Sequence, residues 1–490
     1  MDLLQFVAES KLHAGGIILL AVLLVLLTGF NDPLAKIPGP WYTRWTNLVL
    51  IYKGLIGRKP SYVQSLHLKY GPVVRISPRE VDFSDPTAAQ EIHRIKNLFR
   101  KAQWYRDFAP NATHVFNTTD VEIHRRHRRL LSAPLSETGL KAFVPQIDSK
   151  VRLAISRMEE EAKARGAADV YKWSLFLATD VIGELSFGES FRMLEHGKVN
   201  QYIQELQAIG ALGSIRATFP LLTKLAMRSI PLPGFSKVRA SAVRIRSYAT
   251  QSIQRHRDLV ENEGSDAKPT LLSKLYKARD DESMTPEEVR DNAQAYIVAG
   301  SDTTSNTLTY LVWSVCRHPD VKEKLTRELS RLPDDFTVDD LKGVSYLEHV
   351  IDEALRLYPA VPAGLPRVVP PEGAQLAGYH IPGGYTVLTQ SSSLHQNPEA
   401  FPSPRKFDPS RWENPTSLMK DSFMPFGGGS RICIGLHLAR VELRLATARF
   451  FRAFPNARVS TVEGMSNADM VPEEYFLIAP SGHRCLIQLF

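Results

Sequence analysis

The stretch FGGGSRICIG, residues Phe426 to Gly435, decides how this chain folds and what it folds around. It places Cys433 in a glycine-rich loop, with Arg431 two residues before it and Gly435 two residues after it. The segment Leu436 to Phe450 is apolar with interleaved arginines, which is typical of a buried helix with one solvent-facing edge. The partial positive charge at the start of a helix favours a thiolate. Glycines let backbone N–H groups approach the sulfur and let a flat ligand lie against the loop. Cys433 is therefore a candidate nucleophile, zinc ligand or haem ligand, and an ordinary buried cysteine beside a turn is the simplest alternative.

The composition is that of a globular protein with a sizeable core, because 43% of the 490 residues are hydrophobic and 23% are charged. Three widely separated cysteines, Cys316, Cys433 and Cys485, argue against a disulfide framework and favour a reducing compartment. The net charge of +8 is moderate. A dense basic run at residues 122–129 comes without any nucleic-acid-binding motif, so we expect no nucleic-acid partner.

The N-terminus predicts a membrane anchor. Ala14 to Phe30 is an uncharged apolar run near the minimum length that spans a bilayer, and no small-x-small cleavage site follows it. Lys and Arg gather after the run, which places the rest of the chain in the cytosol. We therefore expect an uncleaved anchor at residues 1–30 and a proline-rich hinge at residues 31–40. The sequons that begin at Asn111 and Asn117 would then face the cytosol and stay unglycosylated.

The rest of the chain predicts a mainly α protein with small β-sheets, an α+β fold. Short strands are indicated at residues 71–78 and 80–84, between 360 and 394, and in the last sixty residues, while residues 140–330 are helical in period. A long helix should run from Pro286 to about Arg317, since proline and acids favour its first turn. A second helix, Leu347 to Tyr358, carries Glu353 and Arg356 on one face, where they can form a partly buried pair.

Three motifs together resemble those of cytochromes P450. The loop fits the haem-binding signature Phe-x-x-Gly-x-Arg-x-Cys-x-Gly at every fixed position from Phe426 to Gly435. The segment from Ala299 to Thr304 (AGSDTT) resembles the family's central-helix motif, and Glu353-x-x-Arg356 with Arg411 resembles its structural ion-pair network. The resemblance covers residues from about 33 to the end. It implies a cytochrome P450 fold, with residues 41–490 as a haem-thiolate catalytic domain.

The resemblance also implies roles for individual residues. Cys433 would be the axial ligand of the iron in haem b, and Asp302 and Thr303 the acid–alcohol pair that delivers protons. Glu353, Arg356 and Arg411 would be structural. The haem would contact Phe426, Gly427, Gly435, Ala299, His124, Arg128, Arg367 and Arg431; of these, His124 stands where many members have tryptophan.

The implied function is that of a microsomal monooxygenase in the endoplasmic reticulum membrane, with a cytosolic catalytic domain. It would insert one oxygen atom from O2 into a lipophilic small molecule, using NADPH electrons from a separate NADPH–cytochrome P450 reductase, with cytochrome b5 as a further candidate partner. A general likeness to fungal P450s suggests a tailoring step on a terpenoid, polyketide or alkaloid. Basic residues Arg125, Arg126 and Arg129 would be free to meet an acidic redox partner. Residues 208–232 would roof the substrate pocket, and residues 474–478 would dip toward the substrate.

Several alternatives stay open at this point. A P450-like isomerase or dehydratase needs no external electrons, but such enzymes usually lack the pair represented here by Asp302 and Thr303. A non-catalytic haem-binding protein would leave that pair unexplained. A zinc site built from Cys433 and His437 needs further ligands. Trp104, Phe108 and Phe116 either line the pocket or belong to the core.

Overall fold

The computed structural model describes residues 16, 32–95, 99–221, 223, 233–263, 270–273 and 284–490. The predicted anchor at residues 1–30 therefore lies, except for Gly16, outside the described residues, and so does part of the predicted roof. Within the described ranges, we find no helix with the length and apolar character that a membrane crossing requires.

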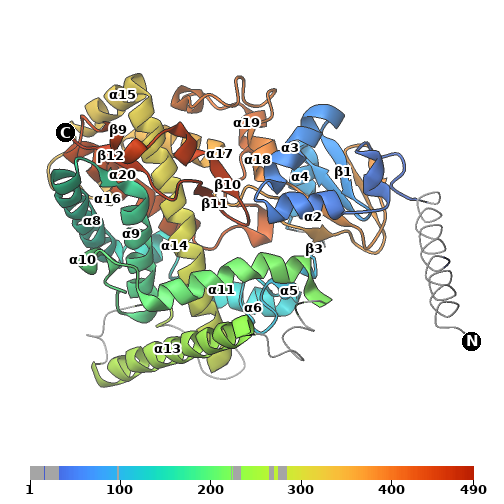
Figure 1. Cartoon of the computed structure of the whole chain (residues 1–490), viewed down its shortest axis with the longest axis horizontal. Coiled ribbons are helices and arrows are strands. Elements are labelled where there is room, and N and C mark those ends of the chain that lie inside the picture. Colours follow the sequence, from blue (N-terminus) through green and yellow to red (C-terminus); the bar gives the residue numbers. More distant parts are fainter. Residues whose placement is uncertain are drawn as a thin grey trace, which may run out of the picture.

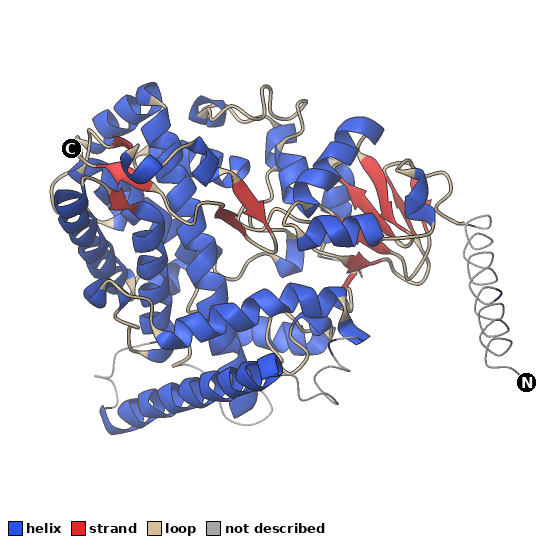
Figure 2. Cartoon of the chain, viewed as in Figure 1, coloured by secondary structure: helices blue, strands red, loops and turns tan. Residues whose placement is uncertain are grey.

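Helices make up most of the body and the strands form small separate sheets, as predicted (Figures 1 and 2). The helices are α2 (Leu48–Leu55), α3 (Lys59–Tyr70), α4 (Pro86–His93), α5 (Trp104–Phe108), α6 (Val121–Ser132), α7 (Glu137–Leu140), α8 (Val144–Arg165), α9 (Val170–Phe187), α10 (Met193–His196), α11 (Gln201–Thr218), α13 (Pro233–Glu263), α14 (Pro286–Arg317), α15 (Pro319–Leu329), α16 (Val338–Leu341), α17 (Ser345–Leu357), α18 (Ser391–His395), α19 (Ser417–Ser422) and α20 (Leu436–Ala453), with 3-10 turns that include η1 (Trp41–Arg44), η5 (Pro409–Trp412) and η6 (Gly429–Arg431).

The largest described sheet has the strand order β1-β2-β8-β5-β3. Its strands are β1 (Val73–Ser77), β2 (Glu80–Phe83), β3 (Arg100–Lys101), β5 (Arg367–Val368) and β8 (Thr386–Leu388). The antiparallel pairing of β3 with β5 sets Lys101 directly opposite Arg367, although the two are far apart in sequence. This register brings two cations side by side at the edge of the candidate site.

The other described strands form three smaller sheets. They are β6 (Ala374–Leu376) with β7 (Tyr379–Ile381), β10 (Pro472–Glu474) with β11 (Ile478–Pro480), and β4 (Ala168–Asp169) with β12 (Leu486–Gln488) and β9 (Arg458–Val459). Residues 475–477 therefore form the turn of a hairpin between β10 and β11, in which Glu474 pairs with Ile478.

The long helix α14 runs through the middle of the body (Figure 1). It starts with a capping box, in which the Thr285 hydroxyl accepts from the N–H of Glu288 and the Glu288 carboxylate accepts from the N–H of Thr285. Pro286 occupies the first helical position, which its fixed φ suits. Its second half is buried almost throughout, so α14 is the internal axis around which α9, α17 and α20 pack.

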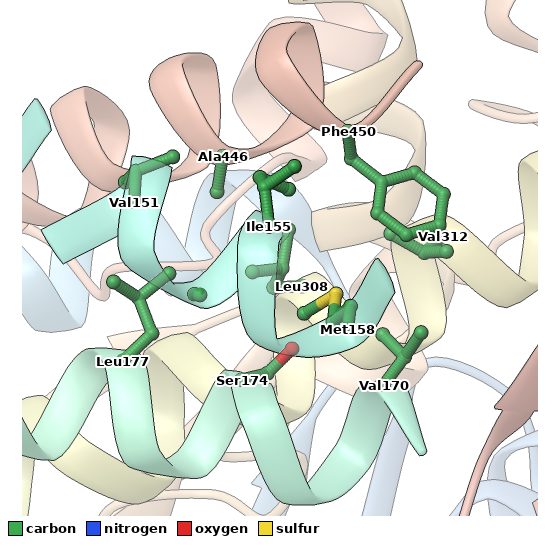
Figure 3. A pocket seen from close by; sticks show the side chains of 11 residues that line it. Val151, Ile155, Met158, Val170, Ser174, Leu177, Leu308, Val312, Ala446 and Phe450 are labelled. Carbon is green, nitrogen blue, oxygen red and sulfur yellow. The ribbon is translucent and has the colours of Figure 1, made fainter. Parts of the chain in front are cut away.

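One small void lies inside the helical half, where α8, α9, α14 and α20 meet (Figure 3). Its volume is about 10 Å³, and its walls are apolar side chains such as Met158, Val312 and Phe450, with Ser174 as the polar exception. Such a space is at the lower limit for one water molecule, and a single hydroxyl is too few partners to hold one. The void is therefore a packing gap that costs about 0.2 kcal/mol, and it is unsuited to a substrate.

Candidate active site

The loop that carries Cys433 has a shape that only glycine permits at one point. The N–H of Cys433 donates to the carbonyl of Phe426 at 2.9 Å, which closes the loop. Gly429 has φ +61°, and a Cβ there would lie 1.7 Å from the carbonyl oxygen of His93, at the end of α4. The loop is thus seated against α4, and Gly435 caps the start of α20 directly behind the cysteine.

Cys433 is the one cysteine of the three whose side chain is exposed; Cys316 and Cys485 are buried. Although part of the Cys433 surface is exposed, the protein atoms packed around the sulfur keep water from it, and this loss of hydration raises the pKa of the thiol by more than the N–H of Gly435 and the guanidinium of Arg128 lower it. The N–H of Gly435 at the helix start thus favours the thiolate, as the sequence indicates, but on its own it does not bring the pKa of the thiol below its ordinary value. A bound metal cation would be needed to keep this sulfur deprotonated, as coordinating thiols are.

A cluster of buried or half-buried cations adjoins the cysteine loop, and we call it the cation cluster. Its members are Lys101, Arg128, Arg367 and Arg431. Arg128 Nη1 donates to the carbonyl of Ile432 at 2.5 Å, which fixes the residue before Cys433. Arg367 is 4% exposed and donates to the hydroxyl of Tyr105 at 2.7 Å.

The cation cluster is short of negative charge. No carboxylate pairs with any of its four members in the part of the chain that the structure describes, and Arg431 Nη1 is buried without a hydrogen-bond partner there. Burial, followed by Arg367, lowers the pKa of Arg431 to about 10, and burial followed by the three arginines holds the pKa of Lys101 well below its ordinary value. Buried cations of this kind need an anion, and the two propionates of a haem supply that chemistry. The residues present therefore fit the implied cofactor.

Lys101 is a site residue that sequence reasoning missed. Its ammonium group donates to the carbonyls of Val115 (3.1 Å) and Phe116, and it is 7% exposed. No motif marks it, because its place depends on the register between β3 and β5. A lone lysine beside an aromatic stretch was the only available signal.

Two histidines near the cation cluster, His124 and His93, are neutral. Burial, followed by Arg431, Lys101 and Arg128, lowers the pKa of His124 to about 2. Burial and Arg367 lower the pKa of His93 to about 3, and its Nε2 lies 2.7 Å from the hydroxyl of Thr389. His124 lies where the sequence placed it, on α6 beside Arg128, and it can act there as a neutral hydrogen-bonding group but not as a cation.

The middle of α14 presents an open face toward the site. Ala299 is exposed and Thr303 is half-buried, whereas their neighbours Ile297, Ser301 and Thr304 are buried. Cys433 is close enough to influence the pKa of Tyr296, one turn before Gly300, so the cysteine loop and this face of α14 lie near each other. The structure thus brings together the two motifs that the sequence singled out.

The acid and the alcohol of the predicted pair point in different directions. Thr303 Oγ1 donates to the carbonyl of Ala299 at 2.6 Å, on the open face. Asp302 Oδ1 instead accepts from Gln207 Nε2 on α11 at 3.0 Å. Burial raises the pKa of Asp302 to about 6, although the Gln207 hydrogen bond lowers it.

The predicted contact of Glu353 with Arg356 and Arg411 is present in the structure. Both side chains of the helix pair are 0% exposed, with Arg356 Nε to Glu353 Oε2 at 2.8 Å and Arg411 Nε to Glu353 Oε1 at 3.0 Å. Glu353 also accepts from the N–H of Asp408 at 2.9 Å and from the Trp412 indole at 3.0 Å. Both oxygens of the buried Glu353 carboxylate therefore have hydrogen-bond partners, as buried polar groups require.

A buried histidine links this network to the cysteine loop, and no sequence motif marks it. His395 Nδ1 lies 3.0 Å from the carbonyl of Arg356, while its Nε2 accepts from the N–H of Met424 at 2.9 Å, just ahead of Phe426. Burial and Arg356 lower the pKa of His395 to about 3, so it is neutral, with one nitrogen donating and the other accepting. The network thus reaches the loop through one hydrogen-bond chain.

Aromatic side chains from two segments gather next to the site. Phe476, at the tip of the β10–β11 hairpin, lies 6.0 Å from Trp104, 5.1 Å from Phe108 and 5.9 Å from Phe116, measured between ring centroids. All four side chains are half-buried. The three aromatic residues that the sequence noted therefore belong to one apolar cluster with the hairpin tip.

The basic residues of α6 are not all free, contrary to the expectation from sequence. Arg126 binds the Glu288 carboxylate, which His127 Nε2 also approaches at 3.1 Å, so this part of α6 is fixed to the start of α14. Arg125 pairs with Glu122 at 2.8 Å on the surface, and Arg129 also has an interaction partner. The zinc alternative finds no support, since the described residues contain no group of three potential ligands, and His437 lies 3.6 Å from Glu137.

Comparison with known proteins gives a consistent result. The family model described as Cytochrome P450 matches residues 37–485. Among curated proteins, the chain is 49% identical to "Cytochrome P450 monooxygenase tazI" of Aspergillus terreus, over 99% of this chain and 100% of that protein. It is 41% identical to "Cytochrome P450 monooxygenase orf2" of Aspergillus niger, over 97% of each. It is 34% identical to "Cytochrome P450 monooxygenase aflV" of Aspergillus parasiticus, over 97% of this chain and 95% of that protein.

Proposed function

The chain belongs to the cytochrome P450 family of haem-thiolate oxygenases, and on that premise we propose a membrane-anchored monooxygenase acting on a lipophilic small molecule in fungal secondary metabolism. One oxygen atom of O2 enters the substrate and the other leaves as water, so each turnover consumes two protons and two electrons. The electrons come from NADPH through a separate reductase chain, with cytochrome b5 as a second donor. The substrate class is a terpenoid, polyketide or alkaloid.

The observation that carries this proposal is the cation cluster beside the exposed Cys433. Lys101, Arg128 and Arg367 lie near one another and lack an ion-pair partner within the described residues, which suits a dianionic cofactor next to the thiol. Cys433 would hold the iron, and the cation cluster the two propionates. When bound, the haem supplies the chemistry that splits O2 and oxidises the substrate.

Two residues of α14, Asp302 and Thr303, would deliver the protons that the reaction consumes. Thr303, on the open face, would exchange the hydrogen bond that it makes with the Ala299 carbonyl for one to a water molecule or to dioxygen. Asp302, whose pKa is raised to about 6 by burial, can carry a proton near neutral pH. The acid–alcohol pair thus supports a monooxygenase over a P450-like isomerase or dehydratase and over a non-catalytic haem-binding protein.

The apolar surroundings support a lipophilic substrate. The half-buried rings of Phe108, Phe116 and Phe476 offer apolar surface, and the open face of α14 adds Ala299. Burial of apolar substrate surface against such side chains drives binding without charged partners.

The test of this function is oxygen incorporation. We expect the full chain in membranes, supplied with a fungal reductase and NADPH, to convert a lipophilic substrate to a product that carries one oxygen atom from ¹⁸O-labelled O2. Product formation that needs neither NADPH nor O2 would favour the isomerase or dehydratase alternative. NADPH consumption with Thr303→Ala should yield mainly peroxide in place of product.

A further inference from the structure

The side chain of Asp302 is directed at a neighbouring helix and not along the open face of its own helix. Its Oδ1 accepts a hydrogen bond of 3.0 Å from Gln207 Nε2, in the middle of α11. The adjacent Thr303 bonds within α14. Successive residues of a helix point about 100° apart, so the two functional groups occupy different sides of α14 and need separate positioning.

Among the described residues, no cation pairs with Asp302 or holds it as a carboxylate. Burial raises its pKa to about 6, and the Gln207 hydrogen bond is the influence that lowers it. From α9, Tyr171 is the titratable residue that interacts with Asp302, and burial followed by Asp302 raises the Tyr171 pKa to about 12. On α11 the nearest acid, Glu205, is bound instead by Arg244 of α13, at 2.6 Å. Gln207 is therefore the polar side chain that meets the carboxyl.

Helix α11 is held in place by contacts with α13 and α5. The Glu205–Arg244 pair ties it to α13. At Gly213 a Cβ would lie 2.7 Å from the ring of Phe108, so α11 and α5 approach closely there. Gln207 thus stands on an element whose position is set by packing, which is the condition for orienting a partner group.

We propose that Gln207 is the positioning residue for Asp302: its amide N–H holds the carboxyl against α11 through a neutral hydrogen bond, so that the acid can bind and release a proton while it stays in one orientation. A lysine or arginine at this place would hold the carboxylate ionised, and an apolar residue would leave one buried oxygen without a partner. The neutral amide of Gln207 gives the buried Asp302 oxygen a hydrogen-bond donor and still allows the carboxyl group to bind and release its proton. This inference rests on the proposed role of Asp302 in proton delivery.

The experiment compares Gln207→Leu and Gln207→Glu with Gln204→Leu in the full-length, haem-loaded protein. Gln204 is an exposed glutamine one turn earlier on α11, and its replacement is the matched control. The first readout is infrared absorption of the protonated carboxyl of Asp302, identified by its loss in Asp302→Asn and followed from about pH 5 to about pH 8. The second is the amount of product formed per NADPH over the same pH range.

We expect the titration midpoint of Asp302 to rise by about one pH unit in Gln207→Leu, because one hydrogen bond to the ionised form is lost. Gln207→Glu should raise it further through like-charge repulsion, and Gln204→Leu should leave it unchanged. The pH at which the amount of product per NADPH changes should shift together with the titration midpoint of Asp302. A Gln207→Leu protein with normal haem content whose midpoint and coupling profile match those of Gln204→Leu would overturn the proposal.

The two readouts separate this inference from the proposed function. If Asp302→Asn couples NADPH to product as well as the unaltered chain, the role of Asp302 fails, while the infrared midpoint still reports whether Gln207 holds the carboxyl. If the titration midpoint of Asp302 shifts but the pH dependence of product per NADPH does not, Gln207 binds Asp302 without positioning it for proton delivery. That result also overturns the proposal.

Discussion

Single charged side chains decide what this site can hold, and Lys101 is the clearest case. It is buried beside three arginines, and its ammonium group contacts the carbonyls of Val115 and Phe116 and two aromatic rings, with no carboxylate among its partners in the described residues. Such a residue is costly for the fold alone, because buried like charges repel and lose hydration. Its presence is explained if an anion completes the cation cluster.

Replacing Lys101 with methionine should therefore weaken haem retention. Methionine keeps the apolar stem but removes the charge that would meet a propionate. We expect Lys101→Met to lose haem faster than the unaltered chain in transfer to apomyoglobin, by about 10-fold, the factor that corresponds to one net charge-assisted hydrogen bond. Arg100→Met, an exposed neighbour on the same strand, is the control and should retain haem normally. Equal haem loss in both variants would remove Lys101 from the site.

Asp302 should lower the stability of the fold at neutral pH. Its folded pKa of about 6 lies above the ordinary value of 3.8, because burial disfavours the charged form. The folded state therefore binds the proton more tightly than the unfolded state, and stability falls as the pH rises between these two values. Above about pH 6, Asp302→Asn should raise the free energy of unfolding, and the full pKa shift sets an upper bound of about 3 kcal/mol on this gain. The gain should be smaller than this bound because Asp302 is only half-buried. The advantage should vanish below about pH 4, and a variant whose melting temperature differs equally at both pH values would contradict this account.

At the scale of elements, the buried network around Glu353 connects α17 to η5 and, through His395, to the cysteine loop. Removing one member leaves buried charges without a partner, which typically costs about 3–5 kcal/mol. Glu353→Gln should therefore unfold at a markedly lower temperature and carry little haem. Glu323→Gln on α15 is the matched control, because Glu323 is 78% exposed and its partner Arg327 is 3.9 Å away. A Glu353→Gln protein as stable as this control would show that the network is dispensable.

The elements that the sequence predicted well are those with local signals. The start of α14 is marked by Thr285, Pro286 and Glu288 within one turn, and its predicted bounds match the observed helix. The cysteine loop and the Glu353 pair also depend on short spacings. Lys101, His395 and Gln207 were missed because each acts through a contact between distant segments, and nothing in the neighbouring residues sets them apart.

Some predictions were wrong because partners lie across the fold. Arg126 was expected to be free, but Glu288 at the start of α14 binds it. The N–H of Gly435 at the helix start behind Cys433 lowers the pKa of the thiol, as expected, but burial of the sulfur, which was not foreseen, raises that pKa by more. In both cases the helix itself was foreseen and the groups packed against it were not.

At the scale of the whole molecule, the proposed anchor fixes which side of the membrane the body occupies, and the two sequons offer a test. Asn117 is 2% exposed and its amide donates to the carbonyls of Ala109 and Ala112, so a glycan on this side chain is incompatible with the fold. Asn111 is exposed. With a cytosolic body, Asn111 should remain unmodified in microsomes, and endoglycosidase treatment should leave the mobility of the chain unchanged.

An acceptor sequon fused with a spacer ahead of Met1 is the positive control, and it should be glycosylated because a single anchor with its body in the cytosol places the start of the chain in the lumen. Glycosylation at Asn111, or its absence from the fused sequon, would contradict the proposed orientation.

The measurement that tests the central claim most directly is the carbon monoxide difference spectrum of the reduced protein, recorded for each cysteine variant. Cys433 is exposed beside the cation cluster, whereas Cys316 and Cys485 are buried elsewhere in the core. We predict the strongly red-shifted Soret band of a thiolate-bound haem in the unaltered chain, in Cys316→Ser and in Cys485→Ser, and its loss in Cys433→Ser alone. A Cys433→Ser protein that keeps this band would show that another residue holds the iron.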